Sequence, residues 1–118
     1  MDKQSQRLVN QLLEKTQEGK LIWTTAFEDG QFKTVLPTGG LAFVVQVKGD
    51  IRRFEVLDEQ QGTVLNETIT RSETDHEPAH HPKLVLYSTI GKLQELVSQQ
   101  ALQANAKLDK AERILAMI

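Results

Sequence analysis

The last third of the chain, KLVLYSTIGKLQELVSQQALQANAKLDKAERILAMI (residues 83–118), carries the most regular pattern in the sequence. Its apolar side chains recur every three or four residues, which is the spacing of one face of an α-helix. At about 100° per residue these positions fall within an arc of about 100°, and most of the charged residues fall on the opposite side. The apolar positions are Leu86, Ile90, Leu93, Val97, Ala101, Ala104, Leu108, Ala111, Leu115 and Ile118.

The pattern predicts one continuous helix over about residues 84–117. The alternative is a break near Ala104 and Asn105, where Asn105 would cap a second helix. Two separate helices have no reason to keep one phase across Asn105. The apolar face keeps the same phase on both sides of Asn105, which favours the continuous helix.

A continuous helix of this length would extend past its own domain. A helix of ~34 residues is ~50 Å long, whereas a compact domain of this size is roughly 35 Å across. Because soluble proteins rarely expose large apolar patches, we expect a second copy to cover the protruding face in a two-fold dimer. The predicted dimer seam consists of Ala101, Ala104, Leu108, Ala111, Leu115 and Ile118.

Upstream of the long helix, apolar and polar residues alternate with a period of two, which is typical of β-strands. Five strands are predicted, at about residues 20–27, 31–37, 41–48, 51–58 and 63–70. The connections between them are short, so neighbouring strands should be antiparallel. The segment 41–48 is apolar on both faces, which predicts a central position in the sheet.

The remaining segments complete a single α+β domain over residues 1–118. Residues 3–18 are predicted to form a helix that ends at Gly19, and residues 71–82 a polar loop. The expected fold is an N-terminal helix, a five-stranded antiparallel meander sheet and a long C-terminal helix packed on one face of the sheet. This order of elements recurs in many small bacterial domains, including secretion-chaperone-like and immunity proteins, and no motif in the chain selects one family.

Composition and charge exclude several classes of function. The chain has 14 basic and 16 acidic residues, interspersed, and no cysteine. There is no basic face to bind nucleic acid, and no apolar run of the ~20 residues that a membrane span requires. The first twenty residues lack the apolar core of a signal peptide. We therefore expect a cytoplasmic protein that uses no cofactor and binds neither nucleic acid nor membrane.

The stretch HEPAH (residues 76–80) matches the H-E-x-x-H pattern of zinc peptidases. In those enzymes the two histidines lie one helical turn apart on the same face of a helix. Pro78 disfavours the helical conformation at the residue before it, and Pro82 does the same two positions beyond the motif. We therefore interpret the match as a chance one and expect no metal site. His76, His80 and His81 remain weak candidates for adventitious metal binding or a pH response.

No other stretch groups a nucleophile, a base and an orienting residue, so we expect that the protein is not an enzyme. The sequence favours a non-enzymatic protein-interaction module, such as a small chaperone, adaptor or immunity-type protein, that is a homodimer and binds an unidentified protein partner. The alternative is a small-molecule-binding protein with an apolar pocket between sheet and helix. The residues expected to line that pocket are Trp23, Phe43, Phe54 and Tyr87.

Overall fold

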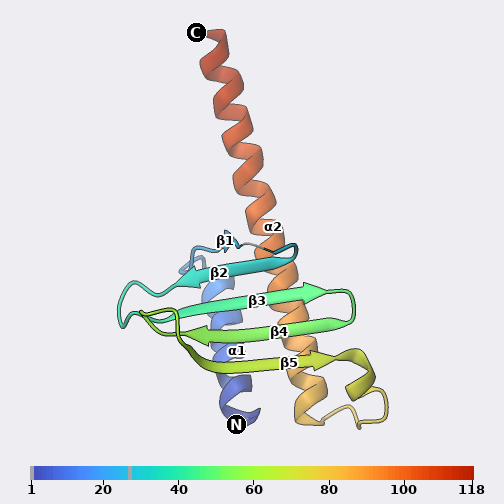
Figure 1. Cartoon of the computed structure of the whole chain (residues 1–118). Helices are drawn as coiled ribbons and strands as arrows, with labels where there is room; N and C mark the ends of the chain where they lie inside the picture. Colours follow the sequence, from blue (N-terminus) through green and yellow to red (C-terminus); the bar gives the residue numbers. More distant parts are fainter. Residues whose placement is uncertain (1, 27) are drawn as a thin grey trace.

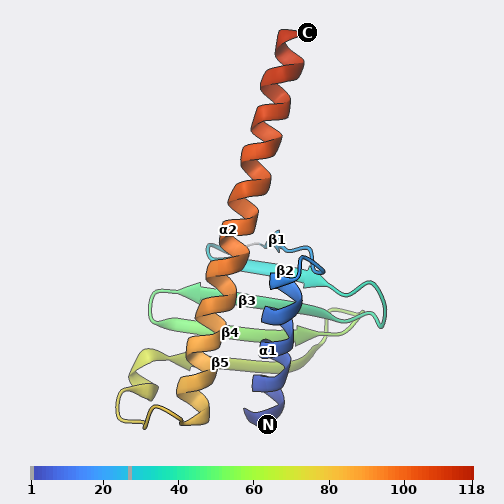
Figure 2. The ribbon, with the colours of Figure 1, turned by 180° about the vertical axis from the view of Figure 1, so that it is seen from behind.

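The protein has two layers, a five-stranded antiparallel sheet and two helices that cover one of its faces (Figures 1 and 2). The computed structural model describes residues 2–26 and 28–118. The elements are α1 (Asp2–Gln17), β1 (Thr24–Thr25), β2 (Gln31–Val35), β3 (Ala42–Lys48), β4 (Ile51–Leu57), β5 (Thr63–Thr70), a 3₁₀ helix (Arg71–Thr74) and α2 (Pro82–Met117). The expected α+β class, with a long C-terminal helix against the sheet, is confirmed.

The strands form a meander in the order β1-β2-β3-β4-β5, with every neighbouring pair antiparallel. β3 lies at the centre, as its two-sided apolar pattern predicts, and its first five residues are all buried. A register irregularity between Val56 and Leu57 interrupts the pairing of β4 with β5. The sheet is nevertheless one continuous layer, with β1 and β5 at its two edges.

The first strand is much shorter than the predicted segment 20–27, because only Thr24 and Thr25 pair with β2. The preceding Trp23 turns toward α1, where its indole Nε1 donates a hydrogen bond to Thr16 Oγ1 at 2.9 Å. The chain is thus held against the helix until it reaches Thr24. Phe27, which the predicted strand included, lies outside the described residues.

The segment between β5 and α2 is more ordered than the predicted polar loop over residues 71–82. It begins with the 3₁₀ helix, in which Thr74 is buried and donates a hydrogen bond from Oγ1 to the Arg71 carbonyl at 2.8 Å. α2 starts two residues earlier than predicted, because Pro82 occupies the first turn, where a missing N–H costs nothing.

The core lies between the sheet and the two helices. Alternate residues of the strands point into it, and Phe43 of β3 stacks on Phe54 of β4 with ring centroids 6.2 Å apart. From α2 the core receives Leu86, Tyr87, Ile90, Leu93 and Val97, which are the first members of the apolar face described above.

One charged side chain, that of Arg52 in β4, reaches across to α2. The Arg52 guanidinium carbon lies 4.0 Å from the centre of the Tyr87 ring, and Nη1 donates to the Tyr87 carbonyl at 2.7 Å. Gly91 makes this approach possible, because a Cβ at that position would overlap the guanidinium group. The pair is thereby stabilised by a cation–π contact and a charge-assisted hydrogen bond.

α2 is one unbroken helix from Pro82 to Met117, and it passes through Asn105 without a second cap. Figure 1 shows it running across the strands, leaving the sheet beyond β1 and continuing far past it. The described residues measure 59 Å along their longest axis and 31 Å and 26 Å across it. The helix therefore extends past its own domain, as its length predicts.

Candidate functional site

The part of α2 that leaves the domain is its most unusual feature, and we call residues 102–118 the extension. Val97 is the last buried residue of the helix, and every residue of the extension is exposed. The boundary lies beside Gln100, whose Nε2 donates to the Thr16 carbonyl of α1 at 3.1 Å. The extension therefore lacks the packing that normally supports a helix. An isolated helix of this length is only marginally stable in water.

An apolar stripe begins at Ala101, one residue before the extension, and continues along it; we define the stripe as Ala101, Ala104, Leu108, Ala111, Leu115 and Ile118. Leu108 is 64% exposed and Leu115 is 70% exposed, although both are large aliphatic residues. The stripe continues the face that Leu86, Ile90, Leu93 and Val97 present to the core, at the same angles around the helix axis. It therefore points to the side of α2 on which the sheet and α1 lie.

The predicted seam residues thus lie along one line. All are exposed except Ala101, which is half-buried and packs against the core of its own domain. All five charged side chains of the extension flank this line or lie behind it, namely Lys107, Asp109, Lys110, Glu112 and Arg113. An exposed apolar line between charged flanks is the pattern by which helices pair with other helices.

The four residues expected to line an apolar pocket are instead packed together. Trp23, Phe43, Phe54 and Tyr87 are all buried members of one core cluster. Tyr87 is further held by a hydrogen bond from its hydroxyl to the Asp50 carbonyl at 3.0 Å. Of the four, Phe43 also borders a groove of about 330 Å³ beside α1, together with Gln4, Leu8, Leu41, Val56, Val64 and Leu65.

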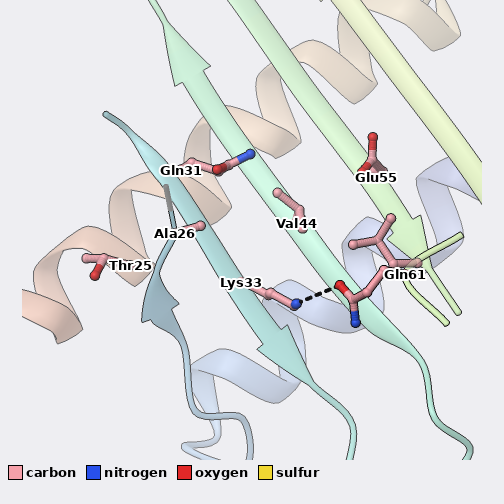
Figure 3. Close-up of a pocket in the computed structure, with 8 residues that line it drawn as sticks. Thr25, Ala26, Gln31, Lys33, Val44, Glu55 and Gln61 are labelled. Carbon is pink, nitrogen blue, oxygen red and sulfur yellow. Dashed lines mark hydrogen bonds between the residues drawn. The ribbon is translucent and has the colours of Figure 1, made fainter. Parts of the chain in front are cut away.

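A larger depression, of about 410 Å³, lies on the opposite face of the sheet, away from both helices (Figure 3). It is lined by Thr25, Ala26, Gln31, Lys33, Val44, Glu55, Leu57 and Gln61. Its charged groups already have partners within the protein. Lys33 Nζ donates to Gln61 Oε1 at 3.1 Å, and Arg53 Nη2 lies 2.6 Å from Glu55 Oε2. The sequence reasoning missed this depression, because the turns that border it are brought together only by the sheet.

The histidine-containing loop has a structural role at the start of α2. His81 has an extended backbone and caps the helix, since its Nδ1 accepts a hydrogen bond from the Lys83 backbone N–H at 3.2 Å. Its Nε2 faces Glu77 Oε2 at 3.3 Å. His76 and His80 are exposed. In the described part of the chain, no three histidine, aspartate or glutamate side chains are grouped so as to hold a metal ion.

This cap can be tested by mutation. His81→Ala removes the acceptor for the Lys83 N–H, and we expect the free energy of unfolding to fall by about 1 kcal/mol. His81→Asn, which restores a capping acceptor, should recover most of that loss in urea unfolding. His80→Ala is the matched control in the same loop and should change stability little. An equal loss in His80→Ala would show that the loop matters for another reason.

Ion pairs at the end of α1 shift the pKa of one surface carboxylate. The pKa of Glu18 is lowered, chiefly by its hydrogen bond with Lys20 and also by the charge of Lys15, but this carboxylate is exposed at the end of α1. Such a shift is typical of a surface ion pair. Among the residues that the structure describes, none of the helices is long and apolar enough to cross a membrane.

Comparisons with known proteins found no match: no family model, no curated protein and no solved structure resembles this chain closely enough to be significant. In the geometry of the molecule itself, the extension is the surface whose exposure most needs a physical explanation.

Proposed function

We propose that this protein is a non-enzymatic interaction module that associates with itself through the apolar stripe of the extension. The observation that carries the proposal is the exposure of Leu108, Leu115 and Ile118 along one line of the extension, the part of α2 that lies beyond its own domain. Burying such a line against a second helix removes apolar surface from water. It also supplies the packing that an unsupported helix of this length requires.

The size of the stripe indicates a moderate affinity. A segment of 18 residues is ~27 Å long and ~10 Å wide, so each face has a projected area of roughly 270 Å², and the two faces together bury well under about 1,200 Å² in total. This is at the low end of specific protein interfaces. We expect a dissociation constant in the micromolar range. At this affinity a pair would dissociate readily, so that each copy could pair with a different copy or bind another protein with a similar helical surface.

Sedimentation equilibrium of the full chain tests the proposal directly. One chain has a mass of 13.3 kDa, and we expect the average mass to rise toward twice this value between ~1 μM and ~1 mM. Helix content measured by circular dichroism should rise over the same range, because pairing orders the extension. A mass of one chain throughout this range would refute self-association.

A further inference from the structure

The direction of the stripe restricts how a second copy can bind. In α2 the same face that contacts the sheet and α1 in the domain continues, without a change of phase, into the extension. A second helix that covers the stripe must therefore lie directly beyond the β1 edge of the sheet, on the sheet side of α2. Figures 1 and 2 show this space open above β1.

A parallel arrangement does not fit this space. In a parallel pair, residues of equal number face each other, so residues 86–97 of the second copy would approach the same residues of the first. That position is already occupied by the sheet and α1, which pack against Leu86, Ile90 and Val97. An antiparallel helix enters from the other end, and its own domain then lies beyond the C-terminus of the first copy.

We propose that two copies pair antiparallel, with Ala101 of each copy opposite Ile118 of the other. This inference rests on the proposed function. The length of the extension sets this register: a shift that lengthens the overlap would push the tip of one helix into the domain of the other. A shift in the opposite direction would leave part of the stripe exposed.

The side chains of the stripe complement one another in this register. Each layer places an alanine against a large aliphatic residue. The pairs are Ala101 with Ile118, Ala104 with Leu115, and Leu108 with Ala111 of the second copy. This alternation of small and large side chains lets two helices approach closely without a void.

The flanking residues agree with the same register. In antiparallel helix pairs, equivalent flanks face each other, so Asn105 lies near Glu112 of the second copy on one side. On the other side the aliphatic stem of Lys107 lies near Ile114. Registers shifted by a few residues either way would instead oppose Glu112 to Glu112 or Lys107 to Lys107, and like charges at these positions are unfavourable.

Cysteine cross-linking distinguishes the two orientations, and the chain contains no cysteine of its own. The variants Ala104→Cys and Leu115→Cys, one of them carrying a tag that changes its mass, are equilibrated in a glutathione redox buffer, separately and as a mixture. In the proposed pair the two sites face each other in the mixture. In either variant alone, the equivalent cysteines are ~17 Å apart along the helix axis, too far for a disulfide.

We expect the mixed disulfide to dominate over either self-linked product by at least tenfold. Leu102→Cys is the control, because this residue points away from the stripe and should link to neither variant. Self-linked products of each variant would indicate a parallel pair and overturn this inference while leaving self-association intact. A dimeric mass without any preferred disulfide would overturn the register. A monomeric mass of the unaltered chain would instead refute the proposed function.

Discussion

Leu108→Glu is expected to abolish self-association in the micromolar range. Each copy would lose a buried leucine worth about 2 kcal/mol, and a two-fold pair contains two of them. The combined loss of about 4 kcal/mol corresponds to a dissociation constant roughly 1,000-fold higher. The introduced carboxylate adds to this loss, because it would face Ala111 of the second copy without a partner charge. Sedimentation equilibrium at matched concentrations measures the change.

The extension provides a closely matched control. Leu102 is 66% exposed, against 64% for Leu108, but it points away from the stripe. Leu102→Glu changes the same residue type in the same helix, and we expect its dissociation constant to stay within about threefold of the unaltered chain. Glutamate and leucine have similar helix propensities, so the helix itself should persist in both variants. If both variants weakened association equally, general loss of apolar surface and not the stripe would be responsible.

Phe54→Ala should have the largest effect on the stability of the domain. Phe54 is 0% exposed, lies in β4, and stacks on Phe43 across the centre of the sheet. Truncating a buried phenylalanine costs about 3–5 kcal/mol, because the apolar contacts are lost and a cavity remains. This is a large part of the 5–15 kcal/mol by which domains are usually stable. We expect the urea midpoint to fall sharply, and the variant to be partly unfolded at elevated temperature.

Phe54→Leu is the control for this prediction, because it keeps much of the buried volume and should cost clearly less. A loss below about 1 kcal/mol for Phe54→Ala would contradict the placement of this ring in the core. The domain variants and the extension variants also separate two properties. Phe54→Ala should lower the free energy of unfolding of the isolated chain, whereas Leu108→Glu should leave it nearly unchanged, since Leu108 is exposed in one copy.

The fold was predictable where one pattern was repeated many times. Ten apolar positions from Leu86 to Ile118 follow one another in nine steps of three or four residues, so chance agreement or a break was improbable, and α2 is continuous. The centre of the sheet was predictable for a related reason: β3 is apolar on both faces, and this pattern favours a place between two neighbouring strands over a place at the edge of the sheet.

Predictions that depended on a single local pattern were less accurate. The alternation over residues 20–27 predicted a full strand, yet Trp23 is held by Thr16 of α1, and only Thr24 and Thr25 pair. Alternation shows that a segment has two faces, but it does not show which distant residue competes for its side chains. Gly91 is a similar case: its reason for being in a helix is the Arg52 guanidinium, 39 positions away in the sequence.

The candidate site divides in the same way. From the sequence alone, the existence of the stripe, its residues and the excess length of the helix followed from the 3.6-residue period and the rise per residue. Tertiary structure decided that the four aromatic residues are packed together in the core, that His81 caps α2, and that the stripe points to the sheet side beyond β1. Periodicity depends on neighbours within a few residues and therefore identifies which side chains need cover. What covers them depends on contacts between distant segments, and these exist only once the chain has folded.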